Sequence, residues 1–128
     1  MINNNQFVLD KIAQAIFDKK GINILVLDLR GVSSLADFAV IAEGNVDRHV
    51  IAISHSVEET LKKELDIRPV YVEGMQTGDW VVLDYLQIMV HIFMPGMRDK
   101  YELETLWNAG KIVDVHINTS QLHSSAAL

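Results

Sequence analysis

The sequence predicts one α/β domain, with a mixed β-sheet of about five strands flanked by helices. Two segments place apolar residues at helical spacing, and short apolar runs bounded by turn residues lie beside them. Two further segments alternate like the arms of a β-hairpin. A chain of 128 residues can bury its own core without a metal or a disulfide. The order helix, two strands, helix, three strands, helix predicts helices packed against one sheet, and the strand order stays open.

The chain begins with a helix that we expect over residues 6–19. The Asn residues before it can cap its start, and Gly21 suits its end. Its apolar stripe consists of Val8, Ile12, Ala15 and Ile16. Residues 24–27 and 38–42 follow as aliphatic and β-branched runs, a pattern typical of strands covered on both faces.

A second helix is expected to start from Asn45 or Asp47 as its N-cap. Its apolar stripe consists of Val50, Ile53, Val57 and Leu61. Two pairs of opposite charge lie four residues apart on the solvent side, at positions 58 and 62 and at positions 59 and 63. Pro69 prevents the helix from continuing, and residues 70–72 form a short strand that ends at Gly74.

Residues 80–84 and 89–93 predict a β-hairpin. A two-residue or a four-residue loop pairs Asp84 with Met89, and the same register pairs Val82 with His91. Because side chains alternate, one face of the hairpin is aromatic and mixed, and the other is aliphatic. The mixed face carries Trp80, Val82, Asp84, Met89, His91 and Phe93. The aliphatic face carries Val81, Leu83, Val90 and Ile92.

The C-terminal part is expected to hold one more helix and one more strand. The helix begins near Arg98 and presents Leu103, Leu106 and Trp107 on one stripe. Residues 112–117 alternate weakly and predict a last edge strand. Small polar residues dominate afterwards, so we expect one domain at residues 1–117 and a loose tail at residues 118–128.

Composition restricts the classes of function. Cysteine is absent, which excludes disulfides, Cys-ligated zinc, iron–sulfur clusters and thiol catalysis. The net charge of −6 repels phosphate backbones, so we expect little direct nucleic-acid contact and a basic protein surface as the natural charged partner. The first residues lack the features of a signal peptide, and no apolar run is long enough to span a bilayer. These observations predict a cytoplasmic protein without a membrane partner.

Neither a metal nor a cofactor is predicted. The five histidines lack the spacing of a metal site on one element, and no phosphate-binding glycine loop is present. Asp84 lies diagonally from His91 on the predicted hairpin and could fix the tautomer of its ring. No nucleophile lies beside His91, so we interpret it as structural rather than catalytic.

Asp28 and Asp37 flank strand ends, where nucleotidyltransferases hold magnesium with paired carboxylates. The residue two positions after Asp37 is Ala39, so the pair is missing. We therefore expect local roles for both aspartates and no catalytic residues. An alternative hypothesis is a metal-dependent nucleotidyltransferase or nuclease that uses Asp28, Asp37 and Asp84. Loss of a nucleotide-dependent reaction in the Asp37→Asn variant would support it.

Aromatic and basic residues are dense between positions 80 and 107, and such residues are enriched at protein interfaces. They are Trp80, Tyr85, His91, Phe93, Arg98, Tyr101 and Trp107. We expect roughly half of them in the core and half on the surface.

These residues belong to a pattern that resembles the RsfS/Iojap family of ribosomal silencing factors over about residues 9–107. The matching segments are DLRGVSSLADF at 28–38, GMQTGDWVVLDY at 74–85, VHIF at 90–93 and LETLW at 103–107. The resemblance implies a non-enzymatic protein that binds ribosomal protein L-fourteen on the large subunit. There it would sterically block subunit joining and reduce translation when nutrients run short. The implied fold is similar to nucleotidyltransferases without their catalytic carboxylate pair.

The resemblance also implies which residues bind the partner. They are Trp80, Leu83, Asp84, Tyr85, Phe93, Arg98 and Tyr101. Because the hairpin register places Leu83 on the aliphatic face, we favour Trp80, Tyr85, Arg98 and Tyr101 over it. Organelle relatives imply an alternative role in large-subunit assembly through the same surface. We expect a monomer on the ribosome, and a homodimer of the free protein through the aromatic hairpin face is a further alternative.

Overall fold

Within the part of the chain that the structure describes, the sheet has six strands in the order β3-β4-β5-β2-β1-β6, and two helices accompany it. The computed structural model describes residues 5–98, 108 and 110–119. The strand pair β2–β5 is parallel and the other pairs of this sheet are antiparallel, which confirms the predicted mixed sheet of an α/β domain. The elements are α1 (Asn5–Asp18), β1 (Ile22–Asp28), β2 (Phe38–Glu43), α2 (Asp47–Leu65), β3 (Tyr71–Glu73), β4 (Trp80–Asp84), β5 (Ile88–Phe93) and β6 (Lys111–Ile112).

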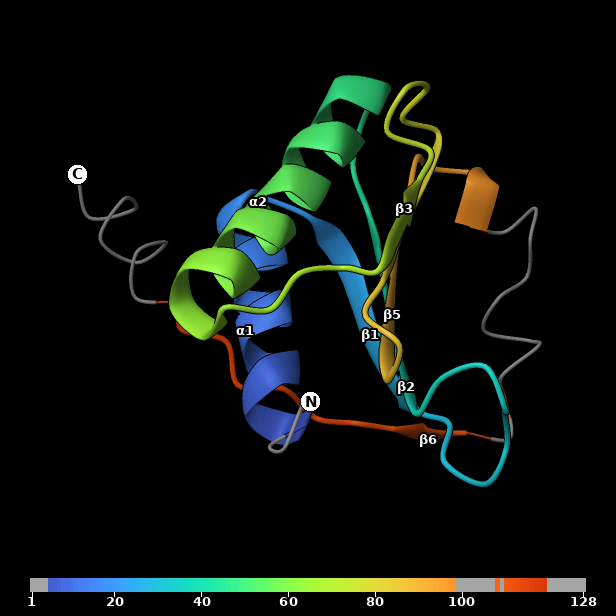
Figure 1. Cartoon of the computed structure of the whole chain (residues 1–128). Coiled ribbons are helices and arrows are strands. Elements are labelled where there is room, and N and C mark those ends of the chain that lie inside the picture. The colour runs from blue at the N-terminus through green and yellow to red at the C-terminus, as the bar shows by residue number, and fades with distance from the viewer. Residues whose placement is uncertain (1–4, 99–107, 109, 120–128) are drawn as a thin grey trace.

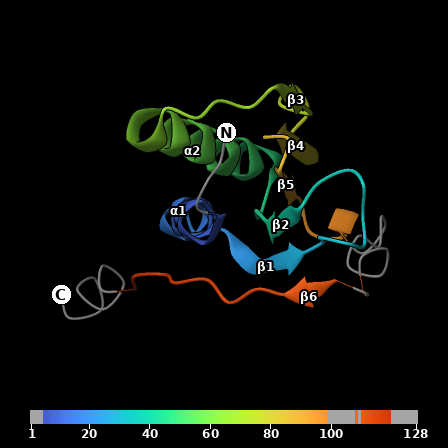
Figure 2. The ribbon, with the colours of Figure 1, turned by 60° about the horizontal axis from the view of Figure 1, so that its bottom comes forward.

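Both helices pack on the same face of the sheet, as Figures 1 and 2 show. The predicted apolar stripe of α2 is confirmed, because Val50, Ile53, Val57 and Leu61 are fully buried. They join one core cluster with the aliphatic hairpin residues Val81, Leu83, Val90 and Ile92. A smaller cluster lies on the opposite face of the sheet and contains Leu27, Leu29, Ala39, Ile41 and Phe93. In the described part of the chain, neither helix has the length and apolar character that crossing a membrane requires.

The ends of the helices differ in part from the prediction. The N-cap of α2 is Val46 and makes no side-chain capping bond, so the predicted caps Asn45 and Asp47 were wrong. The Asn45 backbone N–H instead donates to Nδ1 of the His49 ring at 2.9 Å. After α1 the left-handed residue is Lys20, with φ of 65°. Gly21 is needed for space, because an added Cβ would lie 2.4 Å from Cγ2 of Ile16.

The hairpin has the predicted register and faces. Trp80 pairs with Phe93, Val82 with His91, and Asp84 with Met89. The Tyr85 N–H donates to the Ile88 carbonyl at 2.9 Å, so the loop consists of residues 86 and 87. Leu86 adopts φ of 71°, a left-handed conformation that usually favours glycine. The tight turn is therefore formed without a glycine.

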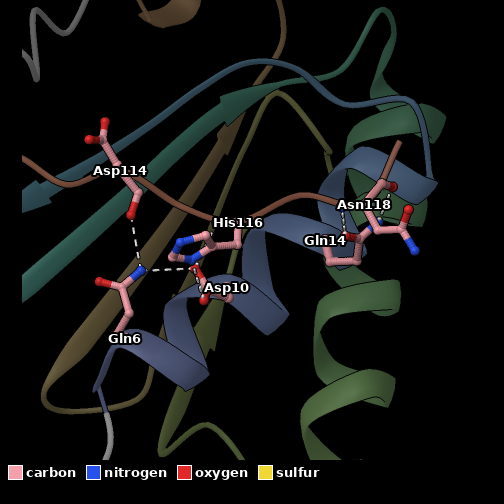
Figure 3. A network of polar contacts seen from close by, with 6 residues as sticks. All are labelled: Gln6, Asp10, Gln14, Asp114, His116 and Asn118. Carbon is pink, nitrogen blue, oxygen red and sulfur yellow. Dashed lines mark hydrogen bonds and ion pairs between the residues drawn. The ribbon is translucent and has the colours of Figure 1, made fainter. Parts of the chain in front are cut away.

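Residues 111–118 form an extended strap that runs from the sheet edge to α1 (Figure 1), and Figure 3 shows its contacts with that helix. Only Lys111–Ile112 pair as a strand, so the strand predicted for residues 112–117 is confirmed only at its start. The Val113 N–H still donates to the Val26 carbonyl of β1, at 2.8 Å. Beyond that point the partners of the strap are side chains of α1, beginning with Gln6, whose amide donates to the Asp114 carbonyl at 3.0 Å.

Side chains of α1 replace a neighbouring strand along the strap. The Asp10 carboxylate accepts from the His116 backbone N–H at 2.9 Å and also contacts Nδ1 of that ring at 3.0 Å. The Gln14 side chain accepts from the Asn118 N–H at 2.6 Å and donates to its carbonyl at 3.1 Å. Four helical residues advance about 6 Å and two extended residues about 6.6 Å. Residues spaced by four on α1 therefore match alternate residues of the strap.

Removing the middle contact should loosen the strap without unfolding the domain. Burial raises the pKa of Asp10, but the hydrogen bonds from His116 and Gln6 together outweigh this and hold that pKa below its ordinary value. We expect Asp10→Ala to lower the free energy of unfolding by about 1 kcal/mol and to speed hydrogen exchange at the His116 amide. Asp18→Ala is the matched control, because Asp18, like Asp10, accepts from a glutamine four residues earlier on α1, at 2.8 Å, whereas the hydrogen bonds to His116 come from Asp10. Equal exchange rates at His116 in the two variants would contradict this role of Asp10.

Candidate functional site

The face of the sheet away from the helices is partly exposed over β3, β4 and β5. Cross-strand partners point to the same side, and here Tyr71 pairs with Asp84, and Glu73 with Val82. We call the accessible part of this surface the open face. It consists of Tyr71, Glu73, Trp80, Val82, Asp84 and Met89. The open face thus combines two aromatic rings, two carboxylates and two apolar side chains, and it carries no basic residue.

Trp80 is the largest side chain of the open face, and its ring has a defined orientation. The indole ring stacks on Phe93, its cross-strand partner, with 5.1 Å between centroids and 23° between planes. The indole N–H donates to Nδ1 of His91 at 3.2 Å. Phe93 and His91 are both buried, so the ring lies on a rigid base. An aromatic side chain held in this way meets a partner with little loss of conformational entropy.

His91 accepts this hydrogen bond because its ring is neutral. Burial lowers the pKa of His91 to about 4. A neutral ring whose Nδ1 accepts a hydrogen bond carries its proton on Nε2. The predicted partner of His91 was wrong, because Oδ1 of Asp84 instead accepts from the Leu86 backbone N–H at 2.8 Å. Trp80 is the residue that the structure places beside Nδ1.

A hollow of about 270 Å³ adjoins Trp80 on the open face. It is lined by Glu73, Gly74, Thr77, Asp79, Trp80 and Val82. Gly74 has φ of 93°, and a Cβ at this position would lie 2.0 Å from the Trp80 carbonyl oxygen. A glycine is therefore required where the turn passes Trp80. The two carboxylates at the rim give this part of the surface a negative charge.

Three of the predicted binding residues lie inside the domain. Leu83 and Phe93 are fully buried, on opposite faces of the sheet. Tyr85 is 5% exposed and packs in the helix-side core, where burial raises the pKa of its hydroxyl. That hydroxyl has no hydrogen-bond partner among the described residues. These positions shape the sheet beneath the open face and offer little surface of their own.

Arg98 is also buried, with 8% of its surface exposed. Its guanidinium lies 3.2 Å from Oε2 of Glu43 and donates to the carbonyl oxygen of Asn23. Asn23 has φ of 54°, and it lies where the pairing of β1 with β2 shifts register. The Arg98 side chain thus ties the segment after β5 to the irregular start of β1. The seventh predicted binding residue, Tyr101, lies outside the described ranges. The helix predicted from near Arg98 to Trp107 also lies largely outside them.

The structure brings two of the seven predicted residues, Trp80 and Asp84, together on the open face. Val82 and Met89 belong to the same face, and the hairpin register contained the signal for them. Tyr71 and Glu73 were missed because they lie on β3, whose place beside β4 requires the strand order. The exposed fraction of Tyr71 is 56%, which leaves most of its ring available to a partner.

The aspartates of the alternative enzyme hypothesis have local partners. Asp28 accepts two hydrogen bonds from the Arg30 guanidinium, at 2.7 and 3.0 Å, and these bonds hold the pKa of Asp28 below its ordinary value. The backbone of Asp37 bridges Leu29 and Gln87. Among the described residues, no group of three or more His, Asp or Glu residues is gathered as a metal site.

Comparison with known proteins decides the family. A family described as "Ribosomal silencing factor during starvation" matches residues 3–127. This chain belongs to that family. Ribosomal silencing factor RsfS of Bacillus subtilis is 33% identical over 118 residues, which cover 92% of this chain and 99% of that protein. The family name describes a silencing factor and specifies no reaction.

Two further relatives extend the comparison. A crystal structure of a Chromobacterium violaceum protein superposes with a TM-score of 0.79 at 31% identity, covering 91% of this chain and 95% of that one. The mouse protein named "Mitochondrial assembly of ribosomal large subunit protein 1" is 29% identical over 105 residues. That match covers 80% of this chain and 46% of the mouse protein. Relatives of this chain are thus named for both silencing and large-subunit assembly.

Proposed function

We propose that this protein binds free large ribosomal subunits through its open face and prevents the small subunit from joining. The contacted protein is ribosomal protein L-fourteen, and the result is reduced translation under nutrient limitation. Steric blockade requires a stable contact and no catalytic group. We also propose a cytoplasmic location, because ribosomal subunits meet there.

The single observation that carries this proposal is the fixed Trp80 ring on an acidic open face. Interface anchors are enriched in Trp and Tyr that lie at the centre of the contact. Glu73 and Asp84 on the same face suit a basic ribosomal protein, and the net charge of −6 disfavours a direct contact with RNA. Membership of the silencing-factor family supports the choice of the ribosome as partner.

Trp80→Ala should weaken binding to isolated large subunits by about 2 kcal/mol or more, close to thirtyfold in Kd. The variant should remain folded, because Trp80 lies at the edge of the smaller core cluster. Quantitative co-sedimentation with large subunits measures the effect, and circular dichroism verifies the fold.

Phe7→Ala provides the matched control for this experiment. Phe7 is an aromatic residue on α1 with 46% of its surface exposed, and α1 lies on the other side of the sheet. We expect this variant to bind large subunits like the unmodified protein. Equal weakening by both substitutions would argue against the open face as the contact surface.

A role in assembly of the large subunit is the second candidate function. The similarity to the mouse protein favours this role, because that relative is named for large-subunit assembly. A strain that lacks this protein would then accumulate large-subunit precursors. Normal precursor levels, together with faster subunit joining in extracts of that strain, would favour silencing of finished subunits.

The open face is also the surface through which two copies of the free protein could form a homodimer. A homodimer of the free protein through the open face would bury Trp80 and Tyr71, and it would compete with the ribosome. Sedimentation velocity of the free protein, with Trp80→Ala beside it, tests this arrangement. A dimer that persists in the variant would have to use another surface.

A further inference from the structure

We propose that His91 is a positioning residue that holds the Trp80 ring in the orientation in which the open face binds its partner. This inference rests on the function proposed above, in which Trp80 is the anchor. His91 itself lies beneath the surface, with 5% of its area exposed, so it acts through Trp80 and not by touching the partner.

The hairpin register places the two rings within reach of each other. His91 pairs with Val82, and Trp80 lies two residues before Val82 on the same face. Such diagonal neighbours are 7–8 Å apart at the backbone, roughly the span that two large rings can bridge. The ring centroids of Trp80 and His91 are 6.0 Å apart, with planes tilted by 33°.

Two different contacts together define the orientation of the Trp80 ring. Stacking on Phe93 fixes the plane of the indole, but a stacked ring can still slide or turn within that plane. The bond from the indole N–H to Nδ1 of His91 is directional, so it selects one arrangement within the plane. The ring planes of His91 and Phe93 are themselves nearly parallel, at 10°, with centroids 6.2 Å apart.

The hydrogen bond requires an acceptor at position 91, and only some residues supply one. Leucine has a similar volume and no acceptor, whereas the side-chain oxygen of asparagine can accept from the indole N–H. Trp80→Phe removes the donor and keeps a ring that can stack. These three substitutions separate the hydrogen bond from the packing of the ring.

The experiment measures co-sedimentation of each folded variant with isolated large subunits. We expect His91→Leu to weaken binding by about tenfold, and His91→Asn to recover most of that loss. Trp80→Phe should weaken binding, and adding His91→Leu to it should cost little more, because the bond is already absent. A second readout is the indole N–H resonance of Trp80, assigned with the Trp80→Phe variant. It should move upfield and exchange faster in His91→Leu, and return in His91→Asn.

The outcomes separate this inference from the proposed function. If Trp80→Ala loses binding while His91→Leu retains it, the positioning role of His91 is overturned and the open face stands as the contact. If Trp80→Ala also binds like the unmodified protein, both proposals fail. Additive losses from Trp80→Phe and His91→Leu would likewise overturn the positioning role, because they would assign His91 a separate effect.

Discussion

Glu43→Ala should lower the free energy of unfolding by about 3–5 kcal/mol, the range typical of breaking a buried ion pair. The carboxylate of Glu43 and the guanidinium of Arg98 are 3.2 Å apart, and their side chains are only 13% and 10% exposed. Truncating Glu43 removes the carboxylate that faces this buried guanidinium and that also accepts from the Asn23 side-chain amide at 3.2 Å. Removing one partner of a buried, hydrogen-bonded ion pair costs more than the pair contributes, because the desolvation of the other partner is no longer offset. Urea denaturation followed by circular dichroism measures the loss.

Glu64→Ala is the matched control for Glu43→Ala. It also removes a glutamate that pairs with a cation, because Glu64 lies 2.6 Å from Nζ of Lys11. These side chains are 50% and 34% exposed, so we expect a change of at most about 1 kcal/mol. Similar losses in the two variants would show that burial does not distinguish the two pairs. That result would contradict the structural role assigned to Arg98.

Acidification should destabilise the protein through His91 by about 3 kcal/mol between pH 6.5 and pH 4. The pKa of His91 is lowered from 6.5 to about 4 by burial, so the unfolded chain binds this proton more readily than the folded protein. Stability from this residue is complete above pH 6.5 and falls as the pH decreases toward 4. Protonation of Nδ1 also removes the acceptor of the Trp80 hydrogen bond.

The pH dependence of His91→Asn isolates this contribution, because asparagine does not titrate. Denaturation curves of both proteins between pH 4 and pH 8 give the difference in unfolding free energy at each pH. We expect that difference to change by about 3 kcal/mol across the range and to level off above pH 6.5. A constant difference would mean that His91 titrates alike in the folded and unfolded chain.

The hairpin was predictable because its information is local. Side chains alternate with a period of two along each strand, and the short loop between the strands fixes their register. That register pairs Trp80 with Phe93. The start of α2 was not predictable in the same way. Asn45 is a good capping type, yet its backbone N–H finds the ring of His49 and the cap falls on Val46. Competition among nearby donors and acceptors decides where a helix begins. The capping preferences of single residue types do not show which of these hydrogen bonds will form.

The candidate site was predictable only in part, because exposure depends on the tertiary structure. Trp80 and Asp84 lie on the mixed face of the hairpin, as the alternation of side chains predicted, and both are partly exposed there. The burial of Arg98 depends on the carbonyl that the left-handed Asn23 presents and on Glu43 of β2, two partners more than fifty residues away in the chain. The hydrogen-bond partner of His91 is likewise Trp80 and not the predicted Asp84, because the Asp84 carboxylate accepts from the Leu86 N–H.

Co-sedimentation of the purified protein with isolated large subunits, isolated small subunits and joined ribosomes tests the proposed function most directly. We expect the protein to travel with free large subunits alone, and saturating protein to prevent those subunits from joining small ones. Binding to joined ribosomes as strong as to free large subunits, or subunit joining that continues at saturation, would contradict steric silencing through the open face.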